Sequence, residues 1–195
     1  MLYNELEKYQ LIVFAEELRT SASESIGGKM LQIESLSRKY AVRKLTESDV
    51  DDIYRLCLGN TLFYQYCGAE PTKDQILHDL HVTPPGVSED RKHYIGFYSE
   101  KELAAVMDLV DGYPEDDVCF IGFFMVSAAI QHGGVGSGII DETSRYLKEL
   151  GKTAIRLGID KGNPQSTSFW KKNGFEIIKE VPMSGGVILL AQRLL

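Results

Sequence analysis

The stretch from Val118 to Leu150, VCFIGFFMVSAAIQHGGVGSGIIDETSRYLKEL, is the most informative part of the sequence because three recognisable segments follow one another in it. Residues 118–126 are nearly all apolar, which predicts a central strand covered on both faces. A glycine-rich loop occupies residues 131–137. Apolar residues then recur at helical spacing from Val135 to Leu150, and Gly151 is a stop signal. The sequence therefore predicts a buried strand, a glycine loop and a long helix in this order.

The glycine loop is suited to hold an anion. Glycine has no Cβ to block close approach, and the first turn of a helix leaves amides without intrahelical acceptors. Two common phosphate motifs nevertheless fail here. Ile139 replaces the third glycine of GxGxxG, and Ile139 and Ile140 stand where the Walker A motif needs its Lys and its Ser or Thr. ATP hydrolysis by this loop is therefore not expected.

The rest of the chain predicts an α/β (α+β) protein whose strands and helices alternate only in the second half. We expect a helical extension and linker over residues 1–39 and one domain over residues 40–195. The extension has an amphipathic helix at 2–18 and a Ser- and Gly-rich loop at 20–28. Further helices are predicted at 50–57, 72–81 and 166–172, and further strands at 40–45, 93–98, 103–110, 154–159, 175–181 and 187–194.

Composition narrows the class of protein. The chain has 195 residues, of which 44% are hydrophobic and 25% charged, as in ordinary globular domains. A net charge of -7 argues against nucleic acid as a partner. The three cysteines form no CxxC pair, and neither a signal peptide nor a membrane-length apolar run is visible. We expect a cytoplasmic protein without a membrane partner, and a homodimer is possible through residues 1–39.

Two motifs together resemble those of one family. The first is Gln-x-x-Gly-x-Gly at 131–136, and the second is NPQSTSFWKKNGF at 163–175, with its Asn, small residue, aromatic pair and Gly-Phe. In order and spacing they resemble the acyl-CoA pyrophosphate loop and a later segment of the GCN5-related N-acetyltransferase (GNAT) superfamily. The resemblance covers roughly residues 40–195.

The resemblance implies a mixed, mostly antiparallel central sheet flanked by helices. It also implies acetyl-CoA as the acyl donor, no metal, and transfer to a primary amine of a small molecule or peptide by direct attack. The loop amides would bind the pyrophosphate, residues 123–126 would pair with the pantetheine arm, and an amide near 124–126 would stabilise the oxyanion. The implied cofactor-binding residues are Phe124, Met125, Val126, Gln131, His132, Gly133, Gly134, Val135, Gly136, Ser137, Asn163, Ser166, Phe169 and Trp170.

The acid that protonates the leaving thiolate is not assigned by the motifs. Many family members use a tyrosine where this chain has Trp170, whose indole N–H donates a hydrogen bond but is no proton source near neutral pH. Ser166, Ser168, Tyr146 or water can substitute, and the thiolate can also leave unassisted.

The general base is not assigned by the motifs either. Some family members carry a glutamate in the central strand, where this chain has Phe120, Gly122 and Phe124. The nearest acids are those at the end of the preceding strand and those of the turn at 115–117. We expect Asp108 to be the base, and we interpret the turn as a solvated surface segment.

Several alternatives remain open at this point. An acyl-CoA-binding protein without transfer activity fits the tryptophan and the missing strand carboxylate, and a nucleotide-binding regulator fits the glycine loop alone. His78 and His81 lie three apart, but no further ligand pattern completes a metal site. Cys119 is expected to be a small apolar core residue. The acceptor is open among small amines, aminoglycoside-like compounds, polyamines and protein amino groups.

Overall fold

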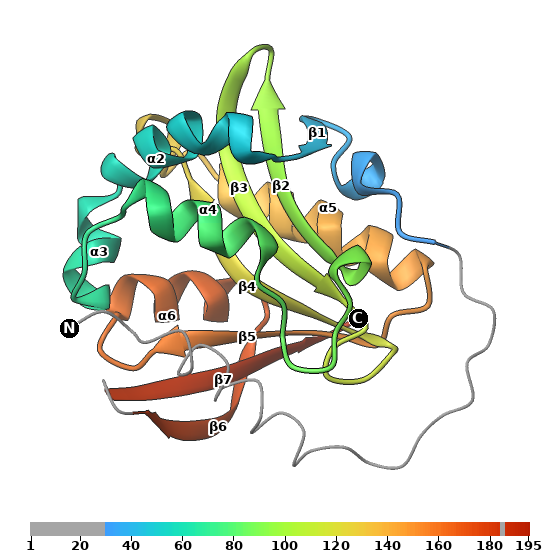
Figure 1. Ribbon diagram of the computed structural model, residues 1–195. Helices are drawn as coiled ribbons and strands as arrows, with labels where there is room; N and C mark the ends of the chain where they lie inside the picture. The colour runs from blue at the N-terminus through green and yellow to red at the C-terminus, as the bar shows by residue number, and fades with distance from the viewer. Residues whose placement is uncertain (1–29, 184–185) are drawn as a thin grey trace.

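A single seven-stranded sheet organises the chain, in the order β1-β2-β3-β4-β5-β7-β6. The computed structural model describes residues 30–183 and 186–195. Neighbouring strands are antiparallel except β4 and β5, which are parallel. The parallel pair is made possible by the long helix α5, which crosses from the end of β4 back to the start of β5. The expected mixed, mostly antiparallel sheet flanked by helices is confirmed (Figure 1).

The observed helices and strands lie close to the positions predicted from the sequence. The strands are β1 (Ala41–Lys44), β2 (Lys92–Ser99), β3 (Glu102–Asp111), β4 (Val118–Val126), β5 (Ala154–Asp160), β6 (Glu176–Met183) and β7 (Gly186–Leu194). The α-helices are α2 (Val50–Leu58), α3 (Thr61–Cys67), α4 (Lys73–His81), α5 (Val135–Glu149) and α6 (Pro164–Lys172), and short 3-10 helices are η1 (Ile33–Leu36), η2 (Glu47–Asp49), η3 (Glu89–Arg91) and η4 (Ala128–Ile130). Helix α3 was not predicted. The predicted helix at 2–18 and loop at 20–28 lie outside the described residues.

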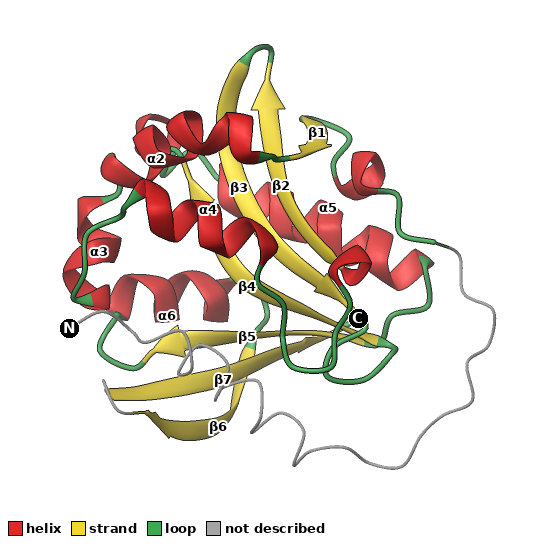
Figure 2. Cartoon of the chain, in the orientation of Figure 1, coloured by secondary structure: helices red, strands yellow, loops and turns green. Residues whose placement is uncertain are grey.

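Helices cover both faces of the sheet (Figure 2). Helices α2 and α4 pack on one face through a cluster that includes Ile53, Ile76 and Leu80. Helices α5 and α6 pack on the other face, where Ile139, Ile140, Leu147 and Trp170 join the largest core cluster. Strands β2, β3 and β4 contribute side chains to both clusters because successive residues point to opposite faces. None of the helices within residues 30–183 and 186–195 is long and apolar enough to cross a membrane.

Strands β4 and β5 separate halfway along their length. Their ladder runs from Val118↔Ala154 to Ile121↔Leu157 and stops there, although both strands continue. In Figure 1 the two strands run apart toward α6. Beyond the split, Gly122 is exposed and Phe123 and Phe124 are half-buried, so the prediction that β4 is covered on both faces is wrong for these three residues, whereas Met125 and Val126 are buried again. The cause is the lost neighbour strand, which leaves this edge of β4 open.

A bulge in β4 lies at the same place. Asp108 of β3 pairs with Phe123 and Leu109 pairs with Ile121, so Gly122 is an extra residue in β4. The insertion reverses the alternation of side chains. Ile121 joins the core beneath α5, whereas Phe123 joins the cluster beneath α2 and α4.

Residues just before β1 pack on the same body as the sheet. Leu36 is fully buried in the largest core cluster, and the hydroxyl of Ser37 donates a 2.5 Å hydrogen bond to Glu142 of α5. The backbone N–H of Gln32 donates to the Tyr146 hydroxyl at 3.0 Å. The division of the chain at residue 39 stays a prediction, and the described part of the extension is anchored to α5.

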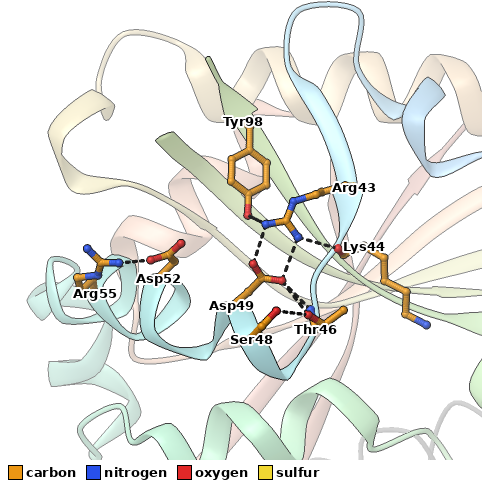
Figure 3. Close-up of polar contacts among 8 residues, drawn as sticks. All are labelled: Arg43, Lys44, Thr46, Ser48, Asp49, Asp52, Arg55 and Tyr98. Carbon is orange, nitrogen blue, oxygen red and sulfur yellow. Dashed lines mark hydrogen bonds and ion pairs between the residues drawn. The ribbon is translucent and has the colours of Figure 1, made fainter. Parts of the chain in front are cut away.

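A charged network fixes the passage from β1 into α2 (Figure 3). The Arg43 guanidinium donates to both carboxylate oxygens of Asp49, at 2.6 and 2.9 Å, and to the Tyr98 hydroxyl at 2.5 Å. The Thr46 backbone N–H also donates to Asp49, at 2.9 Å, within a capping box. Because these groups favour its charged form, the pKa of Asp49 is lowered to about 2, with Arg43 the largest cause.

Asp49→Asn is expected to lower the free energy of unfolding by about 1–2 kcal/mol at pH 7. Asp49 is only 7% exposed, but the Arg43 side chain is 48% exposed, so solvent screens the pair in part. A lowered carboxyl pKa stabilises the fold above the ordinary pKa near 4, and this stabilisation is lost as pH falls toward 2. Urea unfolding at several pH values measures the difference between variant and wild type, which should shrink from pH 4 to pH 2.

The matched control is Asp52→Asn in the adjoining helix α2, where a half-exposed carboxylate pairs with Arg55. It should cost less than about 0.5 kcal/mol. A difference between Asp49→Asn and wild type that stays constant with pH would exclude the ionised carboxylate as the source of the stability.

Candidate functional site

A cavity of about 810 Å³ opens where β4 and β5 separate. One half, the α5–α6 half, is lined by the ends of β4 and β5, the start of α5 and one side of α6. The other half, the α2–α4 half, is lined by α2, α3, α4 and the loops between them, with Tyr94 of β2. The open edge of β4 at Gly122–Phe124 contributes to the lining as well. The cavity is therefore continuous from one face of the sheet to the other.

The start of α5 presents backbone amides to the α5–α6 half. Gly134 is the N-cap with φ +79°, and His132 also has a positive φ of +64°. The first intrahelical bond runs from the Gly138 N–H to the Gly134 carbonyl at 2.9 Å, so the amides of 135–137 precede it. No acidic residue lies in this first turn. The helix start is therefore arranged to attract an anion.

Gly136 allows this helix start to lie close to its neighbours. A Cβ at this position would come within 3.0 Å of Phe169 of α6 and 3.3 Å of Val126 at the end of β4. Any larger side chain must push α5 away from both. Gly138, one position beyond, faces open space, since an added Cβ there would meet nothing within 4 Å.

Helix α6 forms an aromatic wall of the α5–α6 half. Trp170 packs edge-on against Phe169 and Phe175, with ring centroids 5.0 Å away in each case, and lies 5.9 Å from Phe124 of β4. Asn163 fixes the start of the helix, because its side-chain oxygen accepts from the Ser166 N–H at 2.9 Å. The NPQSTSFW segment thus builds a capped helix whose aromatic face fills the space between the separating strands.

A pair of amide side chains ties the glycine loop to the start of α3. The Gln131 side-chain nitrogen donates to Asn60 at 2.6 Å and to the Val126 carbonyl at 3.0 Å. The Asn60 side-chain nitrogen donates to the same Val126 carbonyl at 3.2 Å and to the Leu56 carbonyl at 2.9 Å. These hydrogen bonds hold Gln131, the first residue of the loop, in place. They also connect the α5–α6 half of the cavity to the α2–α4 half.

A buried ion pair lies beside the bulge of β4. The Lys92 ammonium donates to both oxygens of Asp108, each at 2.8 Å, and the two residues are only 4% and 6% exposed. A Cβ built on Gly122 would lie 2.8 Å from an Asp108 oxygen. The carboxylate therefore occupies the space beside Gly122, although Asp108 itself does not line the cavity.

Two further titratable groups lie near this carboxylate. Tyr94 is opposite Asp108 in the β2–β3 ladder, so the two side chains share the face covered by α4. Burial is the largest cause that raises the pKa of Tyr94 well above its ordinary value, and the negative charges of Asp79 and Asp108 add to it. Asp79 on α4 is half-buried and lines the cavity.

Most of the site residues predicted from the sequence line the cavity. All fourteen cofactor-binding predictions line the cavity except Gly133. Of the groups considered as thiolate acid, Ser166 and Ser168 line it, whereas Tyr146 does not and instead accepts from Gln32. The acidic turn at 115–117, interpreted from the sequence as a solvated surface segment, is tied to the fold by side-chain contacts: Glu115 and Asp116 bind Arg156 and Arg91 at 2.8 Å, and Asp117 accepts from Thr153 at 2.7 Å.

Other residues considered from the sequence lie elsewhere. His81 is 3.3 Å from Glu47 at the surface, and the described part of the chain holds no group of three or more His, Cys, Asp or Glu placed to bind a metal. Burial raises the pKa of the Cys119 thiol to about 12, and Cys119 packs in the core as a small apolar residue.

Comparison with known proteins identifies the family. The family model described as "Acetyltransferase (GNAT) family" matches residues 50–175. The chain belongs to the acetyltransferase (GNAT) family. No curated protein matches the chain. Family membership agrees with the strand split, the amide-rich helix start and the capped aromatic helix.

Solved structures with the same GNAT fold are distant in sequence. An acetyltransferase from Thermus thermophilus has a TM-score of 0.65 and 19% identity, over 79% of this chain and 96% of that one. PaiA N-acetyltransferase from Thermoplasma acidophilum, solved with coenzyme A, has a TM-score of 0.59 and 16% identity, over 79% and 98%. The aminoglycoside acetyltransferase AAC(6')-Ib, also solved with coenzyme A, gives 0.61 and 16%, over 78% and 93%.

Three contributors to the cavity were not predicted from the sequence. Helix α3 is preceded by Gly59 and Asn60, and the asparagine is a helix-start signal that would have indicated it. The pairing of Asn60 with Gln131 spans 71 positions, and no local pattern predicts it. Asp79 lies on α4 and Tyr94 lies on β2, and only the tertiary structure brings these two residues near each other.

Proposed function

We propose that this protein is an N-acetyltransferase that moves an acetyl group from acetyl-CoA to a primary amine by direct attack. The observation that carries the proposal is the continuous cavity at the strand split. Its α5–α6 half offers unbonded helix-start amides for an anion, and its α2–α4 half offers a carboxylate and aromatic side chains for an amine. The open edge of β4 lies between them. An acyl donor and an acceptor would therefore meet at this edge.

The residues of the α5–α6 half fit acetyl-CoA as the donor. The amides of 135–137 would bind the pyrophosphate, where no acidic side chain competes in the first turn. The edge of β4 beyond Ile121 would pair with the pantetheine arm, because that edge lacks a neighbour strand. A main-chain amide of this edge would polarise the thioester carbonyl.

Asp108 is the proposed general base. An ammonium must lose a proton before its nitrogen can attack the carbonyl carbon, and a carboxylate on the acceptor side of the sheet serves this step. Asp108 lies beside Gly122, which lines the cavity, so a water at Gly122 would carry the proton to it. The N–C bond then forms and the C–S bond breaks, and the second proton that the nitrogen must lose passes through water, or through Ser166 or Ser168, to the departing thiolate.

A second function is favoured by two particular observations. Trp170 stands where many family members have a proton-donating tyrosine, and Asp108 is already paired with Lys92. A protein that binds acyl-CoA without transferring the acyl group would share the whole α5–α6 half. Release of free thiol from acetyl-CoA in the presence of primary amines separates the two functions. Amine-dependent release supports the transferase, and binding of acetyl-CoA without release under any amine supports the binding protein.

Gly136→Val is expected to weaken binding of coenzyme A by about tenfold or more, as measured by calorimetric titration. The added side chain overlaps Phe169 and Val126, so α5 must move and its first amides lose their alignment. Gly138→Ala is the matched control, since its Cβ meets open space on the same helix, and it should leave affinity unchanged. Equal affinities for all three proteins would place the coenzyme away from the start of α5.

A further inference from the structure

We propose that the α2–α4 half of the cavity takes a primary amine with a single positive charge on an apolar body, and that Asp79 binds its ammonium group. This inference rests on the proposed acetyltransferase function and names the class of its acceptor. The observations that carry it are the position of one carboxylate, the character of the walls around it, and the charge of the whole half.

Asp79 is held in place within the cavity wall. It lies on the inner side of α4, and one carboxylate oxygen accepts from the Gln75 side chain at 3.0 Å, one helical turn away. Gln75 lines the cavity as well. The negative charge of Asp79 reaches inward, because it contributes to the raised pKa values of buried Tyr94 and Cys57. A cation entering this half therefore meets a positioned carboxylate.

The surrounding walls are apolar and aromatic. Phe63 meets Tyr64 edge-on at a centroid distance of 5.1 Å, and meets Phe123 of β4 at 5.9 Å. Ile76 of α4 continues the same wall. Such rings attract an ammonium near their faces, and this attraction is stronger when water is excluded. They also pack against an apolar body along their edges. The cluster also reaches β4, so an amine held here lies next to the proposed transfer site.

The number of charges in this half limits the charge of the acceptor. Of the described residues that line it, the carboxylates are Asp79 and Glu70, and Glu70 is exposed at the mouth in the segment between α3 and α4. Lysine and arginine are absent from that same lining. Each ammonium that leaves water needs an anion or strong acceptor. One inner carboxylate therefore matches one ammonium and does not match a polyamine or aminoglycoside.

The test measures equilibrium binding of 2-phenylethylamine to the full chain, alone and saturated with coenzyme A. Spermidine and kanamycin are the polycationic comparisons, and 2-phenylethanol is the neutral one. Asp79→Asn is expected to weaken binding of 2-phenylethylamine by about 10- to 100-fold. Asp74→Asn, on the exposed first turn of the same helix, is the matched control and should leave the affinity unchanged. Thermal unfolding shows that both variants fold.

Several results would overturn the inference. These are tighter binding of spermidine or kanamycin than of 2-phenylethylamine, equal binding of 2-phenylethanol, and unchanged affinity in Asp79→Asn. The comparison of 2-phenylethanol with 2-phenylethylamine uses the unchanged chain, so it does not depend on how well Asp79→Asn folds. Binding of coenzyme A to the same chain is measured in a titration of its own. A chain that binds coenzyme A but not 2-phenylethylamine refutes this acceptor class alone, whereas a chain that binds no coenzyme A refutes the proposed function.

Discussion

Asp108→Asn should lower kcat for acetyl transfer at pH 7 by about 10²- to 10⁴-fold, the range typical of general base catalysis. The amide keeps the shape of the side chain beside Gly122 but cannot accept the proton of the ammonium. The rate is measured as thiol release at saturating amine, below the thermal midpoint of the variant. Circular dichroism checks that the variant is folded.

The pH profile separates a base from a structural residue. In the variant, only amine that is already deprotonated reacts, and the pKa of a primary alkylamine is about 10. The rate of Asp108→Asn should therefore climb toward that of wild type as pH rises from 7 to 10. A deficit of the same size at every pH would assign Asp108 a positioning role, and an undiminished rate at pH 7 would exclude it as the base.

Lys92→Met is expected to lower the free energy of unfolding by about 3–5 kcal/mol. Both members of the Lys92–Asp108 pair are nearly inaccessible to water, with two 2.8 Å contacts between them. Removing the ammonium leaves a buried carboxylate without its cation, and that carboxylate keeps most of its desolvation cost. Urea unfolding at pH 7 measures the change.

The double variant Lys92→Met/Asp108→Asn removes both charges and should recover part of this loss. Lys101→Met, in the exposed turn between β2 and β3, is the control and should change stability by less than about 0.5 kcal/mol. A cost below about 1 kcal/mol for Lys92→Met would mean that water reaches the pair in solution.

The local features of the fold were predictable because their causes are local. The apolar run of β4 and the glycine-rich start of α5 each act over a few residues. Periodicity and glycine signals indicate such features directly. Helix α6 was predicted from residue 166, two residues late, because the cap at Asn163 was not predicted. The residues proposed to bind the cofactor came from the resemblance to the GNAT family, whose two motifs are continuous segments of chain.

The features missed from the sequence depend on long-range contacts. The bulge at Gly122 appears only when β3 and β4 are paired, and it places Ile121 and Phe123 on opposite faces of the sheet. The sequence places Asp108 near the end of a strand, but its burial against Lys92 requires the register of β2 and β3. Asp79 belongs to a helix whose packing on Tyr94 no local pattern specifies. The residues of the proposed acceptor site are therefore identified only by the tertiary structure.

Calorimetric titration of the unchanged chain with acetyl-CoA, coenzyme A, NAD and ATP shows whether the cavity at the strand split binds an acyl-CoA donor. We predict that acetyl-CoA and coenzyme A bind at one site per chain and that NAD and ATP do not bind comparably. Saturation at a hundred times the Kd should also stabilise the fold by about 2.7 kcal/mol. Absence of binding by acetyl-CoA and coenzyme A at millimolar concentration, or tighter binding of NAD, would contradict the assignment of the cavity at the strand split to an acyl-CoA donor.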